Sequence, residues 1–268
     1  FFSTPTSFMA SFGILERQNT YLIRVEPGDV DLGKSADIED IIREVVDGRV
    51  TLAQGSADLE RVHAEPPRYG PVTTMFAFGL SSSAASRFLG GGLREALVAG
   101  VIGLVIGVLL ILSGRVPALG RVFPFLTAFS ASFIAAAAAT VLPHYSVYVG
   151  TLAGLIVLIP GLTLTTAMTE LSSGHLSSGT ARLSGALMLF LVIGFGVAIG
   201  SQTVTLTLGD YASRVRPEAL PGWTWWLALV AAPLGFTVLF RAHARDAIWI
   251  LLAGALGIAG SRIGSATF

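Results

Sequence analysis

The sequence lacks cysteine and the short motifs of the common hydrolases. Without cysteine, disulfide bonds, thiolate metal sites and cysteine nucleophiles are excluded. The patterns H-E-x-x-H and G-x-S-x-G, which carry zinc-dependent and serine-dependent hydrolysis, are also missing. The four histidines fall in predicted loops or in the N-terminal part, where we expect ordinary polar surface. We therefore expect no enzyme activity, no metal and no cofactor.

Charged residues are scarce and unevenly distributed. They make up 13% of the chain, against about 25% in ordinary soluble domains, while 53% of the residues are hydrophobic and the mean hydropathy is +0.72. Residues 1–70 hold 12 acidic and 7 basic residues, whereas residues 71–268 hold 5 acidic and 10 basic residues. This pattern predicts a membrane protein in which an acidic soluble domain at 1–70 precedes a basic membrane part at 71–268.

The N-terminal part has patterns of strands followed by helices. Residues 1–32 are rich in Phe, Tyr, Ile and Val with turn residues between them, which predicts a β-hairpin. Apolar residues then recur at helical spacing over 38–46, with Gly48 as a stop. Thr51 and Gln54 form a capping-box pattern that predicts a second short helix. We therefore expect a small α+β soluble domain.

Seven apolar segments approach the roughly 20 residues that a hydrocarbon core of about 30 Å requires. The fold class that we predict is mainly α, a polytopic helical membrane protein with about seven spans. Arginines in the loops of one side place the N-terminal domain in the cytoplasm by the positive-inside rule. The segments lie at 72–88, 96–112, 123–142, 147–171, 183–201, 223–240 and 247–264.

Pairs of glycines four residues apart recur in these segments. Such pairs let helix backbones approach closely in lipid, so they predict helix packing rather than a binding site. The pairs are Gly103 with Gly107, Gly150 with Gly154, Gly196 with Gly200, and Gly260 with Gly264.

The stretch GDVDLGKS at residues 28–35 matches the phosphate-loop pattern G-x-x-x-x-G-K-S. Two acids inside the loop, Asp29 and Asp31, would repel the phosphates that its backbone amides must hold. About 70 residues also leave little room for a parallel sheet with crossover helices. We therefore favour a solvated turn in which Ser35 or Asp37 caps the following helix.

A break interrupts the predicted span at 147–171. Pro160 has no amide hydrogen and its ring clashes with the carbonyl four residues earlier, and Gly161 follows it. About 20 Å of helix precedes the proline, so the break falls inside the bilayer. There, broken backbone is tolerated only where it is buried in protein or lines a wet cavity. The free amides of the second half-helix would suit an anionic group such as an amino-acid carboxylate.

Hydroxyl and charged side chains follow the break. Thr163, Thr166 and Glu170 share one helical face by their spacing, and Arg182 can complete a site from the next span. The alternative is structural: threonine hydroxyls bond within their own helix, proline kinks shape packing, Glu170 is hydrated at the membrane rim, and Arg182 is a topology charge. The predicted substrate-binding residues are Pro160, Gly161, Thr163, Thr166, Glu170 and Arg182.

Several stretches resemble one known family. FFSTPTSFMASF, LIRVEPGDVDLGK, SRFLGGG and especially IPGLTLTTAMTELSSGHLSSGTARLSGAL are similar to the threonine/serine exporters of bacterial inner membranes. The resemblance implies a cytoplasmic N-terminal domain, about ten spans in fused members, and export of threonine and serine driven by the proton gradient. It also implies that this sequence is a fragment. The fragment would contain the cytoplasmic soluble domain at 1–70, the first five-span membrane module at 71–202, and a loop with the start of the second module at 203–268.

Three functions remain open at this point. The leading hypothesis is a secondary transporter of threonine and serine in the bacterial inner membrane, with protons and the lipid bilayer as its other partners. The alternatives are a non-transporting membrane scaffold whose acidic domain recruits a partner, and a nucleotide-dependent pump that uses Lys34. We expect no nucleic-acid partner, and homo-oligomerisation stays open.

Overall fold

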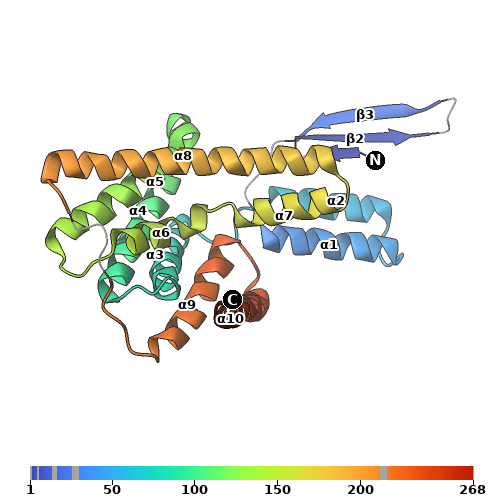
Figure 1. Cartoon of the computed structure of the whole chain (residues 1–268). Coiled ribbons are helices and arrows are strands. Elements are labelled where there is room, and N and C mark those ends of the chain that lie inside the picture. Colours follow the sequence, from blue (N-terminus) through green and yellow to red (C-terminus); the bar gives the residue numbers. More distant parts are fainter. Residues whose placement is uncertain (1, 5, 14–16, 26–29, 212–215, 268) are drawn as a thin grey trace. The chain divides into compact units, whose positions relative to one another are not determined.

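Helices form most of the described chain (Figure 1). The computed structural model describes residues 2–4, 6–13, 17–25, 30–211 and 216–267. Its contacts divide the chain into two units. Unit 1 contains Phe1–Asp29 and Leu158–Phe195, and unit 2 contains Val30–Val157 and Gly196–Phe268.

Unit 1 contains an antiparallel sheet of three strands, β1 (Phe2–Thr4), β2 (Ser7–Phe12) and β3 (Asn19–Arg24), in that order. In the β2–β3 hairpin, Phe8 is opposite Ile23. The hairpin prediction is confirmed. Unit 1 also holds helix α7 (Gly161–Ser172) and the first part of helix α8 (Leu176–Leu208), which continues into unit 2.

Two short helices open unit 2, α1 (Leu32–Val46) and α2 (Leu52–Ala64). The predicted capping box is confirmed, because Thr51 and Gln54 bond to each other's backbone amides. The predicted cap of α1 is wrong. Asp31 accepts a hydrogen bond from the backbone N–H of Lys34 at 2.9 Å, because the helix begins before Ser35 and Asp37, which then lie inside it.

The apolar helices of unit 2 pack around α3 and α4. Helix α3 contacts α4, α6 and α9, and α4 also contacts α5 and α6. Alanines on α3 and α9 form one small core, so the helix axes approach closely. These helices are α3 (Pro71–Phe88), α4 (Leu93–Arg115), α5 (Pro117–Val141), α6 (Val147–Leu155), α9 (Thr224–Leu239) and α10 (Ala247–Thr267).

Each of the seven predicted segments coincides with a helix or, at 147–171, with a broken pair of helices. In the described part of the chain, α4, α5 and α8 are long and apolar enough to cross a membrane. The pair α6 and α7 adds a fourth span if it counts as one, and α9 is a shorter apolar helix. The prediction of about seven spans is therefore not confirmed.

Glycine pairs provide close helix contacts in unit 2. A Cβ atom on Gly103 would lie 2.5 Å from the carbonyl oxygen of Phe78, and one on Gly107 would lie 2.6 Å from the Cα of Met75. The packing prediction is not confirmed for Gly260 and Gly264, because no described atom of another element lies within 4 Å of a Cβ built there. The sequence pattern alone does not separate an occupied glycine face from an open one.

Candidate functional site

The predicted helix break is confirmed at Pro160. Helix α6 ends at Leu155, a 3-10 turn covers Ile156–Leu158, and α7 begins at Gly161 with Pro160 as its N-cap residue. Proline has no side-chain acceptor that can cap a helix. The first amides of α7 therefore begin a new helix without a side-chain cap from Pro160.

An ion pair joins α7 to α8 in unit 1. The Nε of Arg182 donates a hydrogen bond of 3.0 Å to Oε1 of Glu170, and the side chains are 34% and 21% exposed. Gly174, at φ +81°, turns the chain between the helices. A Cβ atom on Gly179 would lie 2.7 Å from Cγ of Leu171, so a side chain there would force the helices apart.

The second carboxylate oxygen of Glu170 has a different environment. Oε2 is buried and has no hydrogen-bond partner among the described residues. A carboxylate oxygen has room for about two acceptor bonds, and leaving one buried without a donor costs roughly 1–3 kcal/mol or more. Glu170 is thus held by Arg182 on one side and ready to accept a donor on the other.

The threonines of α7 fall into two groups. The hydroxyls of Thr165 and Thr169 donate to the carbonyl oxygens four residues earlier, at 3.0 and 2.9 Å. These bonds fit the structural alternative for this row of hydroxyls. The hydroxyls of Thr163 and Thr166 are half-buried, and within the described part of the chain they have no hydrogen-bond partner. Only this second group has a hydroxyl proton that is free to be donated to a solute.

The structure therefore brings together part of the predicted site. Glu170 and Arg182 are in direct contact. Thr166 precedes Glu170 by about one helical turn and Thr163 by about two, on the same face. Pro160 and Gly161 lie at the N-terminal end of α7, away from Glu170, where they define the start of the helix.

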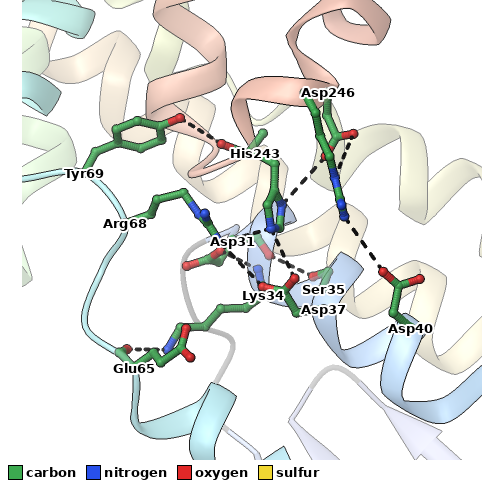
Figure 2. Close-up of polar contacts among 12 residues, drawn as sticks. Asp31, Lys34, Ser35, Asp37, Asp40, Glu65, Arg68, Tyr69, His243 and Asp246 are labelled. Atoms are coloured by element: carbon green, nitrogen blue, oxygen red, sulfur yellow. Dashed lines mark hydrogen bonds and ion pairs between the residues drawn. The ribbon is translucent and has the colours of Figure 1, made fainter. Parts of the chain in front are cut away.

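The phosphate-loop lysine is occupied by contacts within the protein (Figure 2). The Nζ of Lys34 donates to the carbonyl oxygens of His63 and Glu65, at 3.0 and 2.7 Å. A lysine that bonds the last carbonyls of a helix is a C-terminal cap, so these contacts favour the structural interpretation of the motif. Gly28 and Asp29, its first two residues, lie outside the described residues.

A charged cluster near this lysine was not predicted from the sequence (Figure 2). Nε2 of His243 lies 3.0 Å from Nη2 of Arg68 and 3.1 Å from Oδ1 of Asp37, and Tyr69 donates to the carbonyl of Ala242 at 2.9 Å. The expectation that His243 is ordinary polar surface is therefore wrong, because its side chain is largely buried in this cluster. The cluster holds the start of α1 beside the connection between α9 and α10, and a cavity of about 340 Å³ lies next to it. Partners about 175 residues apart leave no local sequence signal.

A second polar group was also missed, inside the helices of unit 2. Glu95, Ser86 and Tyr145 are almost completely buried where α3, α4 and α6 meet. A signal for it was present, because the serine-rich stretch SSSAAS of α3 interrupts an apolar segment. Polar and ionisable residues inside a membrane span usually face other helices rather than lipid, and they often mark functional positions.

Several known proteins that are similar to this chain carry the same name in different yeasts. Pheromone-regulated membrane protein 10 of Debaryomyces hansenii is 28% identical over 204 residues, covering 74% of this chain and 20% of that protein. The proteins of the same name from Eremothecium gossypii and Saccharomyces cerevisiae are 26% and 24% identical, covering 91% and 83% of this chain and 34% and 59% of their own length. The chain thus spans only part of these yeast relatives. No solved structure matches the chain significantly.

A family model also matches most of the chain. The match covers residues 1–204 and includes the sheet, α1 to α7 and almost all of α8. The family is described as "Putative threonine/serine exporter". With its membrane-spanning helices and its membrane-protein relatives, this multi-pass membrane protein belongs to the threonine/serine exporter family.

Proposed function

We propose that the protein is part of a secondary active transporter that exports threonine, serine and similar small amino acids. In this proposal the proton gradient drives export across a bacterial inner membrane, and residues 1–70 lie in the cytoplasm. Family membership supports the substrate class. The observation that carries the proposal is the Glu170–Arg182 ion pair, which lies next to two hydroxyls that have no hydrogen-bond partner among the described residues.

An ion pair of this kind suits a zwitterion. Arg182 offers a planar guanidinium to the substrate carboxylate, and Glu170 offers its unpartnered oxygen to the ammonium group. Before binding, the two side chains neutralise each other, so the empty site carries no net charge. Binding a neutral amino acid keeps the net charge at zero, which avoids the cost of an unpaired charge in an apolar environment.

The hydroxyl group of the substrate then has a defined partner. Thr166 lies one turn before Glu170, within reach of a small side chain bound to the ion pair. The start of α7 at Gly161 is nine residues, or about 13 Å, from Glu170, so one small amino acid cannot contact both. We therefore assign the substrate carboxylate to Arg182 rather than to the first amides of α7.

The test is uptake of labelled threonine into proteoliposomes that hold the full-length protein, with no nucleotide present. We expect uptake that an imposed pH gradient stimulates and that unlabelled serine competes away. Thr166→Ala and Glu170→Ala should each reduce uptake at least tenfold, which corresponds to about 1.4 kcal/mol, and Thr163→Ala should reduce it less.

Thr165→Ala is the matched control, because this hydroxyl is already bonded inside its own helix. Its uptake should stay near wild type. Full uptake by a normally inserted variant that lacks Thr163, Thr166 and Glu170 together would disprove this site.

The sheet of unit 1 favours the scaffold as a second candidate function. Apolar side chains of β2 and β3 are exposed there, and such a surface is typical of a site that another chain covers. A scaffold predicts no solute flux under any gradient from protein that is shown to be folded. The exposed side chains are Phe8, Met9, Phe12, Tyr21, Leu22 and Ile23.

A further inference from the structure

Glu95 is a carboxylate buried at the start of α4, a candidate membrane span. It is 1% exposed. Its two oxygens accept hydrogen bonds from the backbone amides of Gly92 and Ser146, at 2.9 and 2.7 Å. Ser146 is the N-cap residue of α6, so Glu95 lies between the first turns of two helices of unit 2. The partial positive charge at helix starts stabilises a carboxylate.

The basic side chains at this end of the helices have other partners. Arg94 and His144 lie 3.3 and 3.9 Å from the carboxylate of Glu218, and the Nε of Arg87 donates to the hydroxyl of Thr224. Among the described residues, no cationic side chain forms an ion pair with Glu95. A buried carboxylate without a cation is costly to keep charged and marks a functional position in membrane proteins.

Two buried hydroxyls lie near this carboxylate. In the described part of the chain, the hydroxyls of Ser86 and Tyr145 are buried and have no hydrogen-bond partner. A Cβ atom on Gly91 would overlap Ser86 Oγ and lie 3.0 Å from Cβ of Glu95, which places Ser86 and Glu95 both next to this glycine. Burial and then the charge of Glu95 raise the pKa of Tyr145 above its ordinary value, so its phenol keeps its proton.

These hydroxyls can serve both protonation states of Glu95. A hydroxyl donates to a carboxylate and accepts from a protonated carboxyl group. The region is packed, because a Cβ atom on Gly150 would overlap the phenol oxygen of Tyr145. A proton needs no cavity, whereas a sodium ion or an amino acid does.

We propose that Glu95 is the proton-binding residue of the transport cycle. Its carboxylate takes up one proton from one side of the membrane, forms a neutral carboxyl group, and releases the same proton to the other side. No electrons and no further reactant take part. The inference rests on the proposed function, because it assigns the coupling proton of that transporter to a residue apart from the substrate site at Glu170.

The experiment compares two transport modes of the full-length protein in proteoliposomes. The first is accumulation of threonine driven by a pH gradient, and the second is exchange of labelled for unlabelled threonine at equal pH. Glu95→Gln, which keeps an acceptor for a backbone amide but cannot change its charge, should lose at least tenfold in driven accumulation and keep exchange within about twofold. Glu218→Gln, a neighbouring exposed acid, should keep both modes.

Infrared difference spectra provide a readout that does not depend on transport. Lowering the pH of the wild-type protein should produce the carbonyl band of a protonated carboxyl group, and Glu95→Gln should lack it. If Glu95→Gln does not fold, Glu95→Asp takes its place and should shift the pH at which the band appears. Unchanged driven accumulation, or a band that persists in the variant, would overturn the proposal.

The two proposals fail in different ways. Absence of threonine exchange in the folded wild-type protein would disprove the proposed function while the infrared band still tests proton binding by Glu95. If folded Glu95→Gln loses both exchange and driven accumulation, Glu95 has a structural or substrate role. That outcome would overturn the proton-binding proposal and leave the proposed function intact.

Discussion

Glu95 in unit 2 and Glu170 in unit 1 are both acids of helical segments, but different groups hold them. Glu95 is 1% exposed and bonded by two backbone amides. Glu170 is 21% exposed and bonded by the side chain of Arg182. A backbone amide cannot leave its acid without moving a helix, whereas an arginine side chain changes rotamer easily. The second arrangement therefore suits exchange of partners with a solute, and the first suits only a ligand as small as a proton.

The largest expected effect separates the two acids by stability. Glu95→Ala should lower the free energy of unfolding by about 3 kcal/mol or more, since it removes two hydrogen bonds to a charged group, each worth roughly 1.5–3 kcal/mol. Glu170→Ala should cost less than about 1 kcal/mol, because its partner is partly exposed and solvent screens the pair. Thermal unfolding of the purified protein in detergent measures both. Equal losses of stability in the two variants would show that Glu95 and Glu170 do not differ in how strongly the fold depends on them.

A charge exchange sharpens the comparison at Glu170. Glu170→Arg and Arg182→Glu should each reduce threonine exchange more than tenfold, because each leaves two like charges side by side. The double variant restores the pair with opposite polarity and should recover most of the loss. Exchange assays at equal pH measure the three variants. A double variant as inactive as the singles would show that the pair does not act as a unit.

The smallest expected effect concerns Tyr145, the neighbour of Glu95. Because burial raises its pKa in the folded state, the folded protein holds this proton more tightly than the unfolded chain. Stability is complete below the ordinary tyrosine pKa of about 10 and falls as the pH rises above it. Tyr145→Phe should reduce this alkaline loss and, by removing a buried hydroxyl without a partner, raise stability by up to about 1 kcal/mol.

The control for this change is Tyr148→Phe, at a side chain that is 69% exposed. It should alter neither the melting temperature nor its dependence on pH. An identical response of both variants would mean that the hydroxyl of Tyr145 is not energetically distinct.

Local patterns explain what could be predicted from the sequence. The capping box of Thr51 and Gln54, the break at Pro160 and the face shared by Thr166 and Glu170 each depend on residues within a few positions. Helix geometry alone fixes such relations. Glu170 and Arg182 lie on consecutive helices joined by a short turn, so both could be predicted as site residues from the sequence.

Long-range contacts explain what could not be predicted. Glu95 was not selected because its second amide comes from a residue 51 positions away, and His243 because its partners lie near the other end of the chain. Asp31 rather than Ser35 caps α1, since acceptor side chains lie on both sides of Leu32 and only the backbone conformation fixes where the helix begins. The number of spans also depends on helix lengths that apolar composition does not fix.

Helix α8 contains residues of both units. Its 33 residues make a rod of about 50 Å, against a hydrocarbon core of about 30 Å. The rod passes from the residues of unit 1 to those of unit 2 at Phe195 and Gly196 without interruption. Gly194 and Gly196 lie inside this rod, and because glycine is a poor helix former, the rod bends most easily at these two positions.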